Sequence, residues 1–566
     1  MDNVSPLSKR QKIILAILSF VIVAFGQPAW SSFLAMFAAL FGFALFFRIL
    51  LDYPKPKHRF WMATLWFSAV QMVQLSWSVS HPFYYIYAVY PLFCFGESLQ
   101  FGILGLFFTR HRISKVSCLL VISAVWTLFE WSRLYFLSGY TWNPVGLSLA
   151  GNIFSLQAAS LGGIFALSFW VILTNLFALR TWMRWPDKKV LVSWCAIAVA
   201  PYLFGAIHYT YHNHQMNKLL AEGSNSFSTV LVQTAFPVEE MICFKDHNHY
   251  REYVLDEWRK ILQITKKQKG RSIQLIALPE FVVPFGTYTF VYPYEKVEEA
   301  FSEIYGKDSI KTFPPLDLPL AYQVETENEK QWMVNNAFWA QAIANYFDSG
   351  LVIGLEDAED VDGDREYYSS AIYIEPTSRQ DPSFYQPPRY AKRVLVPMGE
   401  YIPFNFCKDL AASYGIVGSF TAGKKAEVWE CDHVPFGVSI CYDETFGDMM
   451  RENKRRGAKI LLNLSSDAWF PHSRLIVQHL EHARLRTVEN GIPLIRSCNT
   501  GVTCAVDSLG RDIASLGGND DDREDISDSL FVQVPMYTYE TLYSRLGDGL
   551  IVGFSMLVVL LFFRLK

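Results

Sequence analysis

Long apolar segments fill the chain as far as His208, and one more follows near its C-terminal end. A helix that crosses a bilayer needs about 20 mostly apolar residues, and each segment approaches that length. The pattern predicts eight spanning helices: Lys12–Pro28, Ser31–Leu51, Phe60–Ser78, Tyr87–Phe108, Val116–Leu137, Leu156–Leu179, Val190–His208 and Leu546–Phe563. We therefore expect residues 1–208 and 546–566 to form a membrane region around a polar block, residues 209–545.

Short apolar runs alternate with helical patterns inside the polar block, which is typical of a layered α/β domain. The predicted strands are Thr229–Gln233, Ile273–Leu278, Leu351–Leu355, Ala371–Ile374, Val434–Ile440, Ile460–Leu464, Leu494–Ser497, Thr503–Val506 and Phe531–Val534. The predicted helices are His249–Thr265, Gln331–Tyr346, Phe446–Arg456 and Arg474–Asn490. An opening strand at Ser228–Gln233 and a closing strand at Ser529–Val534 indicate one domain with a core at 228–536. Thr287–Asn328 lacks periodicity, so we interpret it as a long loop and candidate lid.

Positive charge alternates between the predicted membrane loops. Lys and Arg occur before the first span, after every second span and at the C-terminal end, whereas His81–Tyr85 and Ser138–Asn152 contain none. Loops rich in Lys and Arg remain in the cytoplasm. We therefore expect both termini in the cytoplasm and the polar block on the opposite side of the membrane.

Ionisable residues inside apolar segments are costly in lipid and are usually paired or functional. Glu130 and Arg133 lie three positions apart, which favours an ion pair on one helix face. Glu97 has no evident partner in the sequence.

Bulk composition excludes some classes of function. A net charge of −4 gives no reason to expect nucleic acid as a partner. The nine cysteines form no CxxC pair, which disfavours a zinc site, and their odd number leaves at least one thiol unpaired. The sequence alone does not decide whether a disulfide forms within the polar block.

Three residues at the ends of apolar runs have the chemistry of a covalent catalyst. Glu280 follows Ile273–Leu278 in ALPEF, Lys392 lies in RYAKRVLVP, and Cys441 ends the run GVSIC. Taken singly, each has an ordinary structural explanation, because a lone cysteine is usually a small buried hydrophobe. Together an acid, an amine and a thiol suit nucleophilic catalysis, with the Tyr442 N–H directed at a developing oxyanion.

These segments resemble the nitrilase, or carbon–nitrogen hydrolase, superfamily, whose catalytic residues are Glu, Lys and Cys. With WTLFEWSRLYFLSGYTWNPVG, VLVQTAFP, YAKRVLVPMGEYIPF, SICYD, SSDAWF and QHLEHARLRTVENGIPLIRSCNTGVT added, nearly the whole chain is similar to the apolipoprotein N-acyltransferase family.

The resemblance implies an αββα nitrilase-like domain on the periplasmic face of an eight-helix bundle in the bacterial inner membrane. It implies transfer of an acyl chain from a phospholipid, through a cysteine thioester, to the N-terminal amine of a diacylglyceryl-apolipoprotein. Cys441 would be the nucleophile, Glu280 the general base and Lys392 the oxyanion stabiliser. The supporting or substrate-binding residues would be Glu400, Tyr442, Asp443, Trp469 and Asn499, and no metal or cofactor is implied.

The chain departs from the family pattern at several positions. Asp443 replaces the usual Glu after Cys-Tyr, and Val394, Met398 and Ser466 replace the usual His, Phe and Asn. Trp469 is equally well explained as an active-site residue or as a core residue at a strand end. His479 and His482 have metal-ligand spacing but no third ligand nearby, so packing on a helix is the favoured interpretation.

Two alternatives remain from the sequence alone. A membrane-tethered amide or nitrile hydrolase would use the same three residues with water as the acyl acceptor. A transporter or scaffold with an inactive domain would use the helices alone, although the bundle lacks evident inverted repeats.

Overall fold

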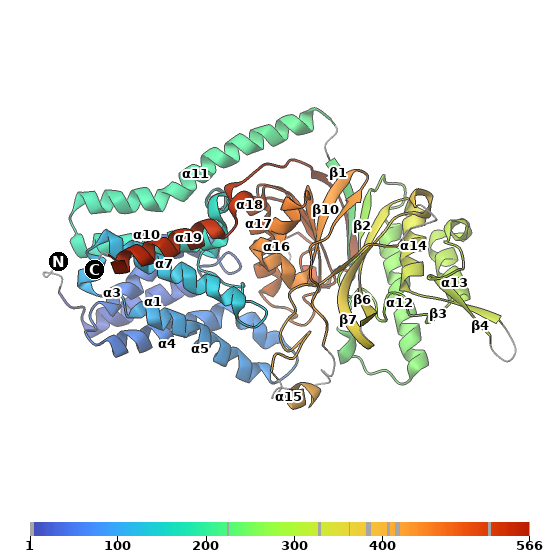
Figure 1. Ribbon diagram of the computed structural model, residues 1–566, viewed down its shortest axis with the longest axis horizontal. Coiled ribbons are helices and arrows are strands. Elements are labelled where there is room, and N and C mark those ends of the chain that lie inside the picture. The colour runs from blue at the N-terminus through green and yellow to red at the C-terminus, as the bar shows by residue number, and fades with distance from the viewer. Residues whose placement is uncertain are drawn as a thin grey trace.

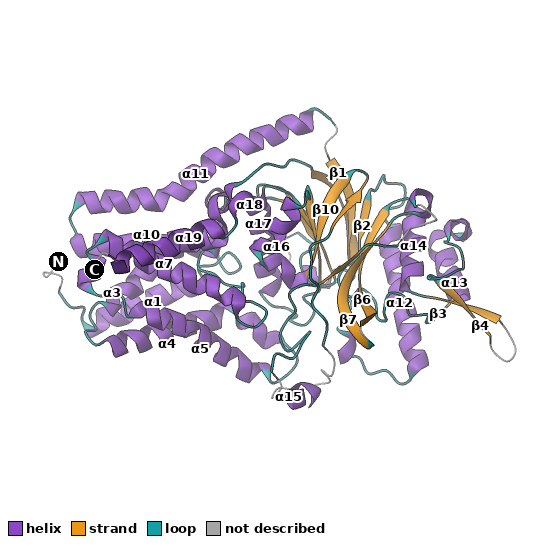
Figure 2. Ribbon diagram, viewed as in Figure 1, coloured by secondary structure: helices purple, strands orange, loops and turns teal. Residues whose placement is uncertain are grey.

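The computed structural model describes residues 5–223, 226–325, 330–361, 363–380, 386–404, 408–413, 419–518 and 522–564. The molecule is elongated, with a helical bundle at one end and a sheet-rich α/β region at the other (Figures 1 and 2). The described chain begins and ends at the end of the bundle that is remote from the strands (Figure 1).

The bundle contains a helix at each of the eight predicted apolar segments. The helices are α1 (Lys9–Ala24), α2 (Ser32–Phe37) continued through a π-turn into α3 (Phe43–Leu50), α4 (Pro56–Gln74), α5 (Ile86–Gly105), α7 (Val116–Ser132), α10 (Ala159–Arg184), α11 (Lys188–Ala221) and α19 (Gly549–Arg564). Among the described residues, four stretches are long and apolar enough to cross a membrane: Ser32–Leu50, Val116–Tyr135, Ala159–Arg184 and Lys188–Ala221. Helix α19 is apolar but shorter. The membrane-type bundle is confirmed, whereas eight crossings remain a proposal.

The predicted ion pair between Glu130 and Arg133 is wrong. Arg133 Nη1 instead lies 3.0 Å from Glu97 Oε2 on α5. Glu130 Oε1 accepts hydrogen bonds from Trp126 Nε1 at 2.9 Å and from the Val145 backbone N–H at 2.8 Å. Helix packing thus gives Glu97 a partner on another helix, which sequence spacing within one helix does not reveal.

The α/β region is a sandwich of two six-stranded sheets. One sheet has the order β15-β1-β2-β6-β7-β8 and the other β14-β13-β12-β11-β10-β9. Their strands are β1 (Ser226–Gln233), β2 (Leu275–Ala277), β6 (Gly350–Val361), β7 (Asp364–Ile374), β8 (Arg389–Ala391), β9 (Val428–Cys431), β10 (Val434–Ile440), β11 (Ile460–Ser465), β12 (Leu494–Cys498), β13 (Cys504–Val506), β14 (Asp512–Ser515) and β15 (Asp528–Pro535). The predicted opening and closing strands lie side by side in this sheet and pair antiparallel, with Val230 opposite Phe531.

Helices cover both outer faces of the sandwich (Figure 2). The first sheet packs against α12 (His247–Lys266), α13 (Tyr294–Tyr305) and α14 (Asn336–Phe347) in one apolar core. The second sheet packs against α16 (Gly447–Arg455) and α17 (Leu475–Asn490), which lie between it and the bundle (Figure 1). A third core fills the space between the sheets, with Leu231 and Val352 on one side and Ile440 and Leu462 on the other. This arrangement confirms the predicted nitrilase-like α/β layers.

The expected long loop at Thr287–Asn328 is wrong over most of its length. It contains β3 (Tyr292–Pro293), α13 and β4 (Ala321–Glu325), while residues 326–329 lie outside the described ranges. The predicted helix Gln331–Tyr346 is also wrong at its start, because β5 (Lys330–Val334) pairs with β3 and β4 in a small third sheet. Val297, Phe301 and Ile304 of α13 are buried against α12 and α14. They supply the helical periodicity that Tyr, Pro and Glu residues obscured in the sequence.

The two bundle loops that lack Lys and Arg both contact the α/β region. The His81 ring stacks on Trp469, with ring centroids 5.5 Å apart. In the other loop, Thr141 Oγ1 and Thr445 Oγ1 are 2.6 Å apart, and Tyr442 Oη donates to the Gly139 carbonyl at 3.1 Å. Both loops therefore lie at the same end of the bundle as the sandwich.

Helix α10 is broken at Gly162–Gly163, and the α/β region fills the break. Gly163 has φ +68°, a conformation that favours glycine. The freed N–H of Ile164 donates to Glu489 Oε1 of α17 at 2.9 Å. A Cβ atom on Gly163 would lie 2.4 Å from Tyr543 Cε2, in α18 (Leu542–Leu546). Close packing at this break therefore ties the bundle to the α/β region.

Gly163→Ala is expected to destabilise the protein, because it adds a methyl group against Tyr543 and strains a positive φ. The cost should be about 1–3 kcal/mol, seen as a lower midpoint in fluorescence-monitored thermal unfolding in detergent. Gly96→Ala on α5 is the matched control, since no atom lies within 4 Å of its added Cβ. Equal melting temperatures for the two variants would contradict this account of the junction.

Candidate active site

Cys441 begins a short 3-10 helix, Cys441–Thr445, directly after β10. Strand β10 pairs with β9 and β11 inside its sheet, so the cysteine is carried by a rigid element. Its φ of +48° is unusual for a residue with a side chain. Such strain persists only where the surroundings hold it, and it is frequent at active sites.

Glu280 and Lys392 come from the opposite sheet. Glu280 follows β2 after Leu278 and Pro279, and Lys392 follows β8 directly. Gly354 of β6 permits this path, because a Cβ there would lie 2.6 Å from Glu280 Cα. Lys392 Nζ lies 3.0 Å from Glu280 Oε1. Glu280 and Lys392 are only 4% and 1% exposed, so the ion pair is shielded from water.

Glu400 joins this pair from the loop after β8. Its Oε1 lies 2.6 Å from Lys392 Nζ, and its Oε2 accepts a hydrogen bond from the Val396 N–H at 2.8 Å. Glu280 Oε2 accepts from the Ser466 N–H at 3.0 Å. One ammonium thus lies between two oriented carboxylates.

The charges at this centre keep the proton on the Cys441 sulfur and leave Glu280 available as a base. Burial raises the pKa of Glu280 to about 7, although the Lys392 charge and a hydrogen bond with Cys441 act in the opposite direction. Burial, together with the Glu280 charge, also raises the pKa of the Cys441 thiol well above its usual range. The neighbouring carboxylates outweigh burial at Lys392 and raise its pKa, so it stays an ammonium. The resting centre is therefore a thiol beside a carboxylate that can accept its proton.

Asp443 links the segments that carry Cys441 and Lys392. Its carboxylate accepts hydrogen bonds from Tyr390 Oη at 2.6 Å, the Val394 N–H at 2.9 Å and the Ile440 N–H at 3.2 Å. Asp443 is completely buried. It holds the backbone on both sides of the site and makes no described contact with the sulfur.

The other supporting residues divide between the site and the interface with the bundle. Asn499 Oδ1 accepts from Thr234 Oγ1 and from the Phe236 N–H, both at 2.7 Å, and its Nδ2 lies 3.3 Å from Ser466 Oγ. The ring of Tyr442 stacks on Trp142, with centroids 5.2 Å apart, so its side chain faces the bundle. Trp469 is half-buried against His81 of a bundle loop. Trp469 is therefore not a fully buried core residue, and its place beside the active site stays a prediction.

A buried polar cluster behind Cys441 was not predicted from the sequence. His479 Nδ1 lies 3.1 Å from Asp467 Oδ1, and its Nε2 lies 3.3 Å from the Cys441 carbonyl oxygen and 3.6 Å from Glu444 Oε2. Arg496 Nε lies 3.6 Å from the same Glu444 oxygen. His482 instead contacts the Trp142 carbonyl oxygen at 3.1 Å. Within the described ranges, no group of three or more His, Cys, Asp or Glu side chains is placed to hold a metal ion.

The eight cysteines within the described ranges are free thiols, which answers the open question of a disulfide for them. Cys407 lies outside the described residues.

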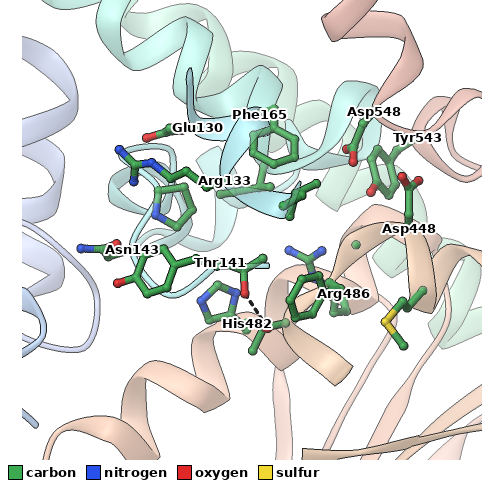
Figure 3. A pocket seen from close by; sticks show the side chains of 18 residues that line it. Glu130, Arg133, Thr141, Asn143, Phe165, Asp448, His482, Arg486, Tyr543 and Asp548 are labelled. Atoms are coloured by element: carbon green, nitrogen blue, oxygen red, sulfur yellow. Dashed lines mark hydrogen bonds between the residues drawn. The ribbon is translucent and has the colours of Figure 1, made fainter. Parts of the chain in front are cut away.

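A separate cavity of about 90 Å³ lies between the bundle and the α/β region (Figure 3). Glu130, Arg133 and Phe165 line it from the bundle side, and Asp448 and Arg486 from the other. Glu280, Lys392 and Cys441 are not among its lining residues. The cavity belongs to the junction between the two parts of the molecule.

An αββα sandwich with a Glu–Lys–Cys centre defines a carbon–nitrogen hydrolase type of domain. A sequence model of the carbon-nitrogen hydrolase family matches residues 247–528, and one of the apolipoprotein N-acyltransferase N-terminal domain matches residues 18–177. The chain is 30% identical over 552 residues to the apolipoprotein N-acyltransferase of Chlamydia pneumoniae, covering 95% of this chain and 94% of that protein. It is 29% identical over 564 residues to that of Chlamydia caviae, covering 97% and 96%.

The chain belongs to the apolipoprotein N-acyltransferase family and is an acyltransferase by that membership. Among solved structures, it is similar to the carbon-nitrogen hydrolase from Helicobacter pylori G27, with 16% identity and a TM-score of 0.34 over 55% of this chain and 90% of that one.

Cys441 should react with an activated ester at a rate that rises as the pH passes about 7, because Glu280 must be ionised to accept the thiol proton. The measurement is the burst of p-nitrophenol released from a p-nitrophenyl ester by the purified protein. Glu400→Gln should move the midpoint to lower pH, since the Glu400 charge raises the pKa of Glu280. A midpoint above the ordinary thiol pKa of 9.0 would instead make ionisation of Cys441 limiting.

Proposed function

We propose that this protein transfers an acyl chain from a phospholipid to the α-amine of the N-terminal diacylglyceryl-cysteine of apolipoproteins, through a thioester on Cys441. The observation that supports it most directly is the buried contact of Lys392 with Glu280 and Glu400. This contact lies beside Cys441, a thiol with positive φ at the end of strand β10. Family membership supports lipid and lipoprotein substrates. Thioesters react readily with amines, so the scheme uses no metal or nucleotide.

In the first half-reaction, Cys441 Sγ attacks the ester carbonyl carbon of the phospholipid while Glu280 accepts the thiol proton. The tetrahedral oxyanion forms between the Lys392 ammonium and the Tyr442 N–H, which stabilise it electrostatically. Collapse breaks the ester C–O bond, and Glu280 returns the proton to the leaving oxygen. The products are a lysophospholipid and the acyl-thioester.

In the second half-reaction, the lipoprotein amine attacks the thioester carbonyl, and Glu280 accepts a proton from the attacking nitrogen. Collapse of this intermediate breaks the C–S bond, and the sulfur regains a proton from Glu280. The products are an amide and the free thiol. Glu400 holds Lys392 in place through both steps by its 2.6 Å contact.

The proposed setting is a bacterial inner membrane crossed eight times, with both termini in the cytoplasm and the catalytic domain in the periplasm. Loop charge supports this orientation, because the two loops without Lys or Arg contact the α/β region. At the opposite end, Arg48, Lys12 and Arg110 surround Asp52. The corresponding domain division is 1–208, 209–545 and 546–566.

Incubation with phospholipid should add one fatty-acyl mass to the intact protein, and hydroxylamine should remove it, as expected for a thioester. Cys441→Ser and Cys441→Ala should show no hydroxylamine-sensitive increment. Cys498→Ser is the matched control, because Cys498 also lies at the end of a strand but has no carboxylate or amine partner in its described hydrogen bonds. An unmodified wild-type protein that still acylates lipopeptide would contradict the thioester scheme.

Addition of a diacylglyceryl-cysteine peptide separates the transferase from the hydrolase alternative. A transferase should convert the acyl-enzyme to an N-acyl peptide in step with loss of the enzyme's added mass. A hydrolase would release free fatty acid at the same rate with or without peptide. Mass spectrometry of the peptide and of the released lipid distinguishes the two outcomes.

A membrane-impermeant maleimide tests the orientation. It should label the exposed thiol of Cys243 in intact spheroplasts, because residues 209–545 face outward in the proposal. In a Cys243→Ser background, Lys188→Cys lies at the exposed first residue of α11 and should react only after the membrane is opened. The reverse labelling pattern would overturn the proposed orientation.

A further inference from the structure

The carbonyl oxygen of Cys441 is held by two side chains from different elements. His479 Nε2 on α17 lies 3.3 Å from it, and Asn463 Nδ2 on β11 donates to it at 3.2 Å. Asn463 Nδ2 also lies 3.1 Å from Ser439 Oγ of the neighbouring strand β10. His479 and Asn463 are both completely buried. Two buried donors therefore converge on one backbone oxygen next to the nucleophile.

Fixing this carbonyl fixes the following amide as well. A peptide unit is planar and trans, so the Tyr442 N–H points away from the side on which the Cys441 carbonyl is held. The φ of +48° at Cys441 makes the local backbone costly by about 1–3 kcal/mol, so the unit would relax without such contacts.

The surroundings of His479 fix which atoms donate. Its Nδ1 faces the Asp467 carboxylate, and its Nε2 faces the Cys441 carbonyl, which can only accept. A proton on Nε2 satisfies the Cys441 carbonyl. Glu444 Oε2 lies 3.6 Å from both His479 Nε2 and Arg496 Nε. The Asp467 contact at Nδ1 holds the ring with Nε2 directed at the Cys441 carbonyl.

We propose that His479, with Asn463, is a positioning residue that holds the Cys441–Tyr442 peptide so that the Tyr442 N–H faces the oxyanion of the tetrahedral intermediate. The inference rests on the proposed thioester chemistry. It assigns to helix α17 a role in the reaction although Glu280, Lys392 and Cys441 all lie outside that helix. The hydrogen bonds of His479 and Asn463 to the Cys441 carbonyl form a clamp on this peptide. Loss of the clamp raises the barrier to acylation of Cys441 and leaves its thiol in place.

The test compares acylation with alkylation in the full-length protein in detergent. Acylation of Cys441 by phospholipid forms an oxyanion, whereas alkylation by iodoacetamide displaces iodide and forms none. His479→Ala should slow acylation by about 10–100-fold, below the 10²–10³ that loss of an oxyanion donor costs. Its alkylation rate should stay within about threefold of wild type, because thiolate formation depends on Glu280 and Lys392.

Graded substitutions sharpen this test. His479→Gln keeps a donor that can reach the Cys441 carbonyl and should restore part of the acylation rate. His479→Asn is too short to do so and should behave like His479→Ala. Asn463→Ala removes the second donor and should also slow acylation selectively. His482→Gln is the matched control on the same buried helix, and its acylation rate should stay near that of wild type.

Selective loss of acylation in His479→Ala and Asn463→Ala, with rescue by His479→Gln, supports the clamp. Acylation at the wild-type rate in both variants overturns it. A parallel fall of acylation and alkylation in both also overturns it, because the residues would then only maintain the fold. A wild-type protein that forms no acyl-enzyme would overturn the proposed function instead, which keeps the two failures distinct.

Discussion

The catalytic centre depends on one buried ammonium that lies between two carboxylates. Lys392 Nζ is 3.0 Å from Glu280 and 2.6 Å from Glu400, and it is shielded from water. Without the carboxylates, a buried ammonium would lose its proton. Without the ammonium, the two carboxylates would repel each other. The three groups together carry one excess negative charge, which protonation of Glu280 near pH 7 removes. The cluster is therefore suited to take up one proton at neutral pH, and attack by the Cys441 thiol releases one.

Much of the sandwich and its nucleophile could be predicted because buried strands leave a clear trace in sequence. Two apolar runs end abruptly at polar residues. The run that ends at Cys441 forms strand β10, and the run before Glu280 forms strand β2. Lys392 follows only the three-residue strand β8, so its place became clear through family resemblance. No comparable sequence pattern indicated the polar cluster around His479. Helix α17 is buried on nearly all sides, although it contains as many charged and polar residues as a surface helix.

The departures from the family pattern change side chains but leave the hydrogen bonds around the catalytic centre in place. Ser466 replaces Asn, but Glu280 is held by the Ser466 backbone N–H. Val394 replaces His, and its backbone N–H donates to Asp443. Asp443 is one methylene shorter than the usual Glu and still reaches Tyr390 Oη and the backbone amides of Val394 and Ile440. At positions 394 and 466 the donor is a backbone N–H, which is present whatever the side chain. A divergent sequence can therefore retain the geometry of the site.

Helix α17 explains why the bundle and the catalytic domain form one unit. Gln478 and His482 contact the Trp142 carbonyl of a bundle loop, and Glu489 caps the break in α10. Between these contacts, His479 reaches the carbonyl of the nucleophile. A phospholipid ester remains at a nearly constant depth near the bilayer surface, so a sulfur that moved relative to the bundle would meet it rarely. Because the same helix contacts both the bundle and Cys441, packing within the protein sets the position of the sulfur relative to the bundle.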